Sequence, residues 1–252
     1  MGTIKSPALI IKSMNWRDSS RILSLFTREF GRLDVIAKGV NRSTSQSAGI
    51  LEPLNLIEAV IYFSEKRELQ LLGKADLETA FVGIRGDLEK MKYGLGILEI
   101  LYVFFRDHNP ATEFYNFVVY LLAELEKGIA AKIIFWYFML KLTSYLGFKP
   151  EFKHCHICNE EIKNGQVYFS FESGSVICLR CGDSGTSRIN LSSGLCKYLA
   201  ELQLTHYKKI GSVKDPIISD DEITIFLQNY LRFHTNEKLE LNAIKYYELT
   251  GK

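Results

Sequence analysis

The chain has 252 residues, 47% of them hydrophobic, and its 31 Lys and Arg face 29 Asp and Glu, for a net charge of +2. This length predicts two or three domains, and so small a net charge does not by itself indicate a nucleic-acid-binding protein. The first residues hold no apolar signal region, and the longest apolar run, residues 133–140, is far short of the ~20 residues that span a bilayer, so we expect a soluble, cytoplasmic protein without a membrane partner.

The first 80 or so residues predict a small β-domain. Five segments are rich in apolar and aromatic residues, several of them alternating with polar ones: Thr3–Ser13, Ser20–Thr27, Arg32–Gly39, Leu54–Ser64 and Glu68–Asp76. Turns are predicted at residues 15–18 and 30–31, and a longer polar loop around residues 39–49. Five short strands in this length favour a closed barrel, and an OB-fold is the leading candidate.

From about residue 80 the pattern becomes helical. Helices are predicted at Asp87–Arg106, Thr112–Lys127 and Ala130–Tyr145. The third has apolar residues on nearly every face, which indicates a buried element of a helical bundle. Gly147 predicts a left-handed cap for that helix, and Pro150 prevents its continuation.

Four cysteines form two matched pairs, with 19 residues between the pairs: Cys155, Cys158, Cys178 and Cys181. Two residues between cysteines let a tight turn aim both thiolates at one ion, and two such knuckles make a tetrahedral sulfur cage that suits zinc. The intervening residues 166–177 predict a β-hairpin, the usual body of a zinc ribbon. We expect one structural Zn²⁺ per chain, because four thiolates leave no coordination position open for chemistry.

Other interpretations of the cysteines explain the spacing less well. A disulfide pair or reduced core cysteines would not require a double C-x-x-C pattern, and a reducing cytosol favours metal ligation over disulfides. His154 and His156 flank the first cysteine and could substitute as ligands, but four cysteines already complete a site. Cys196, the fifth, lies in an apolar helical stretch and is expected to be a buried small side chain.

The C-terminal part predicts further helices. Asn190 is the expected cap of a helix that runs to about Tyr207, and residues 219–222 form a capping box for a helix over 223–234. The acidic residues of that box could bind a divalent ion, but carboxylates in a first helical turn also complement the helix dipole, and we favour the latter.

These elements predict an α+β multidomain protein, in which the ribbon is inserted into an all-α helical bundle. The expected divisions are an OB-fold barrel, a first helical part, the ribbon and a second helical part, at residues 1–80, 81–150, 151–187 and 188–252.

Enzyme motifs are not found. The chain has no phosphate-binding G-x-x-x-x-G-K-[ST], no G-x-G-x-x-G, no H-E-x-x-H and no G-x-S-x-G. His108, His206 and His234 lie at or near predicted helix ends, where a surface position is the default. We therefore expect a protein that is not an enzyme.

The predicted barrel carries the clearest charge signal. Residues 1–42 hold eight Lys and Arg against three acids. On five-stranded barrels nucleic acid crosses strands 2 and 3 and the adjoining loops, although charges on a solvated strand face would give the same count. The candidate phosphate contacts are Arg21, Arg28, Arg32, Lys38 and Arg42. Trp16 and Phe30 lie near turns, where each could stack on a base or close an end of the barrel.

The same region resembles a known family. Residues 18–33 read DSSRILSLFTREFGRL and residues 35–39 read VIAKG, which is similar to the N-terminal signature of the bacterial recombination mediator RecO family. The similarity continues through residues 51–54, the helical region and the cysteine knuckles, so it covers essentially the whole chain.

The resemblance implies a mediator of double-strand-break and gap repair that binds single- and double-stranded DNA and anneals complementary strands. It also implies RecR and the C-terminal tail of the single-strand-binding protein as partners, RecA as an indirect partner, and a place at the nucleoid. Transferred by position, the five cations named above lie in the DNA-contacting barrel. Where many relatives carry several further cations after Gly39, this chain offers only Arg42 within Val40–Gly49.

An acidic, aromatic-ended tail of that kind would suit an apolar groove rimmed by cations. The helical region is rich enough in apolar residues to supply one, and the candidate rim residues are Arg106, Lys127, Lys132 and Lys141. The alternative to a DNA mediator is an RNA-binding barrel-and-ribbon accessory factor in RNA processing or translation.

Overall fold

The computed structural model describes residues 2–41, 49–106, 109–182, 188–216 and 219–250, with side chains described to residue 247. The chain forms two compact units, one made of Met1–Ala131 together with Glu240–Lys252, the other of Lys132–Leu239. None of the helices in the described ranges is long and apolar enough to cross a membrane.

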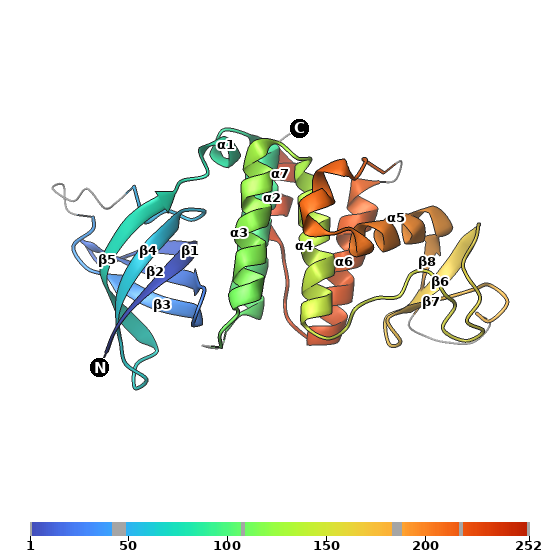
Figure 1. The fold of residues 1–252 in the computed structure, drawn as a ribbon, viewed down its shortest axis with the longest axis horizontal. Coiled ribbons are helices and arrows are strands. Elements are labelled where there is room, and N and C mark those ends of the chain that lie inside the picture. The colour runs from blue at the N-terminus through green and yellow to red at the C-terminus, as the bar shows by residue number, and fades with distance from the viewer. Residues whose placement is uncertain (1, 42–48, 107–108, 183–187, 217–218, 251–252) are drawn as a thin grey trace. The chain divides into compact units, whose positions relative to one another are not determined.

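The first unit begins with a closed five-stranded barrel (Figure 1), as predicted. Its strands are β1 (Gly2–Trp16), β2 (Ser20–Thr27), β3 (Gly31–Ala37), β4 (Leu56–Phe63) and β5 (Leu69–Thr79). They follow the order β1-β2-β3-β5-β4, β4 pairs back with β1, and only β3 and β5 run parallel. The barrel is OB-like, and the chain is an α+β protein.

The barrel core follows from the alternation of side chains along the strands. Leu23 and Leu25 of β2 point inward opposite Leu33 and Val35 of β3, and all four are fully buried. Two strand ends were predicted too early. β1 extends through Trp16, and the turn begins at Arg17, whose φ is 52°; β5 extends through Thr79.

Helices α1 (Val82–Arg85), α2 (Leu88–Phe104), α3 (Thr112–Lys127) and α7 (Asn242–Thr250) complete the first unit. α2 and α3 were predicted, whereas α1 and α7 were not. The Asp87 carboxylate caps α2 by accepting from Lys90 N at 3.0 Å. In the barrel wall, Phe26 packs against Phe105 and Tyr115, at centroid distances of 4.9 and 5.7 Å, and joins the barrel to these helices.

The second unit is built around α4 (Ala131–Tyr145), with α5 (Ser193–Leu204), a 3-10 helix (Tyr207–Ser212) and α6 (Asp220–Thr235). The predicted burial of α4 is confirmed, since its residues 133–140 are all 2% exposed or less. Trp136 Nε1 donates to Thr224 Oγ1 at 2.9 Å, which fastens α4 to α6. Gly147 has the predicted left-handed conformation, with a φ of 93°.

The ribbon sheet has the order β7-β6-β8, from β6 (Gln166–Ser170), β7 (Ser175–Ile177) and β8 (Arg188–Ser192). The predicted hairpin is confirmed, but the third strand was missed. Asn190 pairs with Tyr168 inside β8 and caps nothing; the Ser192 hydroxyl caps α5 instead, by accepting from Leu195 N at 3.1 Å.

Two predicted helix ends differ from the structure. α5 ends at Leu204 instead of continuing to Tyr207, because the chain turns into the 3-10 helix. Ser219 precedes α6, as predicted, but its side chain makes no capping hydrogen bond, so the capping box is not formed.

Candidate metal centre and nucleic-acid interface

The ribbon brings the four predicted cysteines together. The Sγ atoms of Cys155, Cys158, Cys178 and Cys181 all lie within 4.8 Å of one another, and the Sγ atoms of Cys158 and Cys178 are 3.8 Å apart. A tetrahedral site with metal–sulfur bonds of about 2.3 Å places its sulfurs ~3.8 Å apart. All five cysteines are free of disulfides. The cluster can therefore hold a metal ion.

Two short turns aim the four thiols at one point. In the first knuckle Asn159 N donates to Cys155 O at 2.9 Å, with Asn159 in the left-handed region at a φ of 57°. In the second, Cys181 N donates to Cys178 O at 3.0 Å. His156 N also donates to Val176 O at 2.9 Å, which fixes the first knuckle to β7.

The environment of the sulfurs favours the thiolate form at Cys155 and disfavours it at Cys181. Burial acts to raise the pKa of Cys155, but hydrogen bonds from the backbone N–H groups of Cys158, Cys178 and Ile157 outweigh it and lower the pKa to about 6. The Cys178 side chain is the main cause that raises the pKa of Cys181 to about 12, with burial adding to it. Four sulfurs this close repel as anions, and a bound dication is what permits all four to be deprotonated.

The neighbouring histidines lie outside this cluster. His154 and His156 are exposed, and His154 Nδ1 is 3.9 Å from a Glu151 carboxylate oxygen. Among the residues that the structure describes, the four cysteines form the one group of three or more potential metal ligands.

Aromatic side chains tie the ribbon to α6. Phe169 of β6 packs against Phe226 and Tyr230 of α6, at centroid distances of 5.0 and 5.6 Å, and Phe152 adds a further contact to Phe169 at 5.7 Å. The Tyr230 hydroxyl donates to Phe148 O at 2.9 Å. Loss of the ribbon would therefore uncover the apolar face of α6.

Three of the five predicted phosphate contacts are held in intramolecular bonds. Arg21 donates to Glu52 at 2.7 Å and to Asn41 at 2.8 Å, and its side chain is only 16% exposed. Arg32 donates to the carbonyl of Tyr102 at 2.7 Å.

Arg28 is the third of these, paired with Glu29 at 2.6 Å; this contact raises the pKa of Arg28. Its side chain is nevertheless 43% exposed, so the pair lies at the surface. Such a pair contributes little to stability, and a phosphate could displace the carboxylate.

Lys38 differs from these three. It is exposed and makes no ion pair or hydrogen bond within the described part of the chain. It borders a hollow of about 290 Å³ that also includes Gly39, Gly73 and Lys74, at the place where β5 continues past the end of β3. The fifth predicted contact, Arg42, lies outside the described residues.

The two candidate aromatic residues have different environments. Phe30 is partly buried, packs against the barrel core and lies 6.1 Å from the ring of Phe63. Trp16, at the end of β1, is 43% exposed. Phe30 therefore fits the interpretation that it closes an end of the barrel. Trp16 has the exposed ring that stacking on a base would require.

The cations predicted as candidates to rim an apolar groove are engaged in intramolecular contacts. Lys127 pairs with Glu124 at 2.7 Å, and Lys132 pairs with Asp215 and Asp220 at 3.1 Å each. Lys141 donates to the carbonyl of Gln203 at 2.7 Å. Arg106, the fourth, also has an interaction partner.

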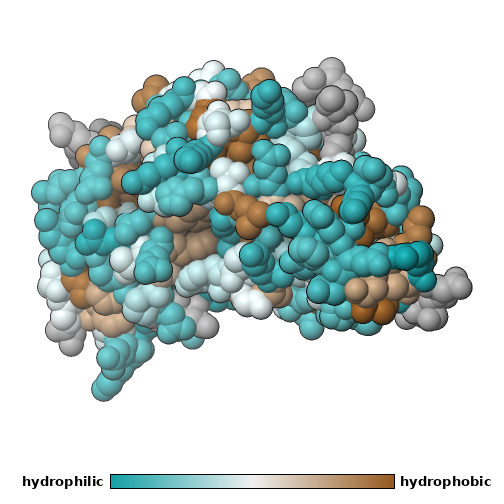
Figure 2. Space-filling model, turned by 45° about the vertical axis from the view of Figure 1, so that its right-hand side comes forward, coloured by the Kyte–Doolittle hydropathy of each residue, from teal (hydrophilic) through white to brown (hydrophobic). Residues whose placement is uncertain are grey.

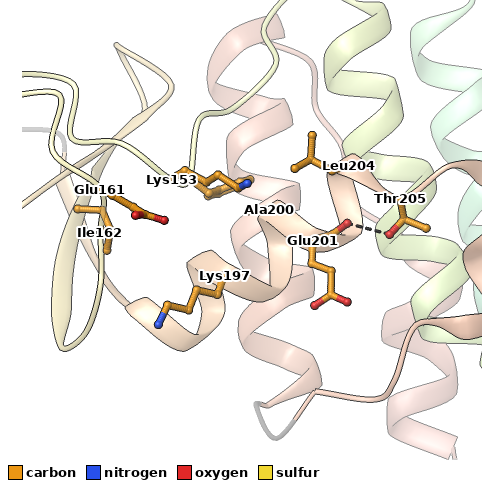
Figure 3. Close-up of a pocket in the computed structure, with 9 residues that line it drawn as sticks. Lys153, Glu161, Ile162, Lys197, Ala200, Glu201, Leu204 and Thr205 are labelled. Carbon is orange, nitrogen blue, oxygen red and sulfur yellow. Dashed lines mark hydrogen bonds between the residues drawn. The ribbon is translucent and has the colours of Figure 1, made fainter.

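A groove does exist elsewhere in the second unit (Figure 3). Its volume is about 420 Å³, and side chains from the ribbon and from α5 line it. Phe152, Ile162 and Ala200 provide buried apolar surface, and Leu204 adds an apolar side chain that is 61% exposed. Its polar lining residues include Lys153, Lys197, Glu161 and Glu201.

Comparison with known proteins shows which family has this sequence and architecture. The family model for the N-terminal part of recombination protein O matches residues 1–81, and the model for its C-terminal part matches residues 85–242. The chain belongs to the RecO family. The resemblance noted in the sequence is thereby confirmed over both the barrel and the helical–ribbon region.

Individual relatives of this RecO-family chain are distant but aligned over most of their length. DNA repair protein RecO of Desulforamulus reducens is 24% identical over 240 residues, covering 95% of this chain and 93% of the relative. That of Caldanaerobacter subterraneus subsp. tengcongensis is 27% identical over 235 residues, covering 93% and 94%. That of Prosthecochloris aestuarii is 28% identical over 182 residues, covering 69% of each chain.

One exposed cation of the RecO-family barrel was missed. Arg17 lies in the β1–β2 turn, is exposed and makes no ion pair or hydrogen bond within the described ranges. Arg17 was counted among the cations of residues 1–42 but was not predicted as a phosphate contact. The signal that could have indicated more is the adjacent Trp16, since an aromatic next to a cation in a barrel loop is a common nucleic-acid contact.

Proposed function

We propose that this RecO-family chain is a non-catalytic recombination mediator that binds single- and double-stranded DNA and anneals complementary strands. It would act with RecR on DNA coated by the single-strand-binding protein and so help RecA to load, in the cytoplasm at the nucleoid. The observation that carries the proposal is the match of both RecO family models, which together include the barrel, the helices and the ribbon.

The decisive test is strand annealing on DNA coated by the cognate single-strand-binding protein. We expect the chain to accelerate annealing of coated complementary strands well beyond the rate of the coated strands alone. A mixture with heat-denatured protein is the control. Annealing at the control rate, with the chain present in excess over DNA, would contradict the proposal.

The metal in this proposal is one structural Zn²⁺ per chain, held by Cys155, Cys158, Cys178 and Cys181. Zinc is supported by the all-sulfur ligand set and by the spacing of the Sγ atoms. The ion would supply folding energy and no reaction step.

We propose that the barrel contacts DNA through Lys38 and through Arg28, which lies at the surface. Arg21 and Arg32 remain in their ion pairs and support this surface. Arg42 is a further candidate. Each phosphate neutralised on a single strand should contribute about −0.7 to the slope of log affinity against log salt. Lys38→Gln should therefore weaken binding to every sequence alike and make the slope shallower by about that amount.

The control for this variant is Lys245→Gln on α7, which removes one exposed charge away from the barrel. If Lys38→Gln and Arg28→Gln both bind like the parent at low salt, the barrel face is not the site. Parallel titrations with RNA of the same sequence test the alternative, since an RNA accessory factor should prefer that strand.

For the tail of the single-strand-binding protein, we propose the groove drawn in Figure 3 as the docking site. Lys153 and Lys197 can attract acidic residues and a terminal carboxylate, while Leu204 and the buried apolar lining can accept an aromatic ring. The test is titration of a peptide copying the tail. Removal of its last aromatic residue and Leu204→Ser should each weaken binding about ten-fold.

Ile225→Ser serves as the matched control, because Ile225 is 55% exposed on α6 and does not line the groove. Equal affinity for the intact and shortened peptides would remove the groove from the proposal and leave the annealing proposal intact.

A further inference from the structure

A row of apolar side chains crosses the outer face of the barrel. The strand register places Met14 of β1 opposite Ile22 of β2, Ile22 opposite Ile36 of β3, and Ile36 opposite Leu71 of β5. Their sequence neighbours Leu23 and Val35 point into the core, so this row points outward. Three inter-strand spacings make it ~14 Å long.

The row is accessible, and it ends at an exposed tryptophan. Met14 is 46% exposed, and the other three side chains of the row are half-buried. Trp16 lies two residues beyond Met14, on the same face of β1, and pairs with the small Ser20 of β2. The Trp16 ring therefore lies beside the row, and no large side chain on β2 is paired opposite it.

The end of the barrel next to Trp16 is held firmly. Asn41 N donates to Ser19 O at 3.1 Å, and the Asn41 amide donates to Asn15 at 3.0 Å. Arg21 in turn donates to Asn41 at 2.8 Å. These bonds join the segment after β3 to the β1–β2 turn, so the backbone that carries Trp16 is held in place.

The charges beside the row indicate what would cover it. Arg17 follows Trp16, and Lys38 continues β3 beyond the row; both are exposed cations with no ion pair or hydrogen bond in the described part of the chain. Asp34, on the neighbouring row, is paired with Arg32 at 3.5 Å. An apolar strip with cations at its end suits a polyanion that also presents flat apolar rings.

A protein segment suits this surface less well. The barrel is closed, so β3 has neighbours on both sides and offers no edge for an added strand.

We infer that this strip, with Trp16 as its main stacking surface, binds the bases of single-stranded DNA while Arg17 and Lys38 contact the backbone. The inference rests on the proposed DNA-binding function and adds its selectivity. In a duplex the base faces are covered by stacking, so a duplex can use the cations but not Trp16. Base–aromatic stacking tolerates any sequence, which suits annealing of arbitrary strands.

The experiment compares three labelled probes by fluorescence anisotropy at one salt concentration: an oligothymidylate, an abasic strand of equal length, and a hairpin duplex. Trp16→Ala should weaken binding to the oligothymidylate about ten-fold and leave binding to the abasic strand and the duplex unchanged. Trp16→Phe should restore most of the loss. Tyr246→Ala, which removes another aromatic side chain that is 63% exposed, is the matched control.

A second readout uses the intrinsic fluorescence. The chain has two tryptophans, and the other, Trp136, is 0% exposed. Oligothymidylate should quench the emission of the parent, whereas the abasic strand should not, and Trp16→Phe should abolish the quenching.

Equal loss on all three probes, or unchanged emission at saturation with oligothymidylate, would overturn the stacking inference. If Lys38→Gln weakens all probes while Trp16→Ala weakens none, the stacking inference fails and the DNA-binding proposal survives. If neither variant changes binding, the barrel face is not the DNA-binding site, and both the stacking inference and the proposed DNA contact on the barrel fail.

Discussion

The barrel and the ribbon are both small β-structures, but different forces hold them. The barrel closes on itself, and its inward side chains, among them Ala8, Ile10 and Leu25, are completely buried. The ribbon has a three-residue strand in β7 and combines an aromatic contact to α6 with a cluster of four cysteines that can hold a metal ion. The comparison leads us to expect that apolar burial is enough for the barrel, whereas the ribbon depends on a bound metal ion.

The largest effect should follow removal of the metal. Cys158→Ser breaks the sulfur cage, and since structural zinc contributes roughly 10–16 kcal/mol of apparent binding energy, the ribbon should unfold. Metal content should fall from one equivalent to near zero. Hydrogen exchange should show lost protection in β6–β8 and unchanged protection in the barrel strands.

Cys196→Ala is the control for this change, because Cys196 is also buried in the second unit but lies outside the cluster. It should keep the metal. Metal well below one equivalent in the parent, in protein never exposed to chelator, would contradict a structural metal centre.

The converse change should act on the barrel alone. Leu25→Ala removes a fully buried side chain from the barrel core and should lower the free energy of unfolding by about 3 kcal/mol, through lost burial and the cavity left behind. Metal content should stay at one equivalent. Loss of metal in this variant would mean that the ribbon depends on the barrel, against the comparison.

Helix caps provide a finer version of the same test. Asp87 caps α2 and Ser192 caps α5, each by accepting from a backbone N–H. Replacement of either by Ala should cost about 1 kcal/mol in a denaturant titration. After chelation the cost of Ser192→Ala should vanish, because its helix follows directly on the ribbon, while the cost of Asp87→Ala should persist.

The smallest effect concerns pH. Burial lowers the pKa of His234, against a backbone hydrogen bond at Phe171 that raises it, and the ring stacks on Phe148 at 4.8 Å. When the pH falls through 6.5, the ordinary pKa of histidine, His234 therefore binds a proton more readily in the unfolded state than in the folded state. Stability should be full above that pH and decrease below it, down to the lowered pKa.

His234→Phe keeps a ring against Phe148 and removes the titration. The difference in denaturation midpoint between pH 7.5 and pH 5.5 should therefore be smaller in this variant than in the parent. An unchanged difference would assign the pH dependence to other groups.

Much of the local structure could be predicted from the sequence. The strands and the long helices follow from periodic apolar residues, and their bounds mostly agree to within a few residues, because alternation and helical spacing are local properties. β8 could not be predicted in this way: residues 188–192 are a strand because they pair with β6. α1 likewise depends on Glu126, which accepts from Gly83 N and Ile84 N at 2.8 Å each, across 43 and 42 residues.

The sequence by itself determined the sulfur cluster, because cysteines two residues apart can aim at one ion whatever surrounds them. It also determined the excess of cations in residues 1–42. Only the tertiary structure decided which cations are held in intramolecular bonds. Arg21 and Arg32 are bound to residues distant in the chain, whereas Lys38 is exposed. The tertiary structure likewise separated Trp16 from Phe30, since exposure depends on what other segments pack against a ring, and composition near a turn carries no information on that.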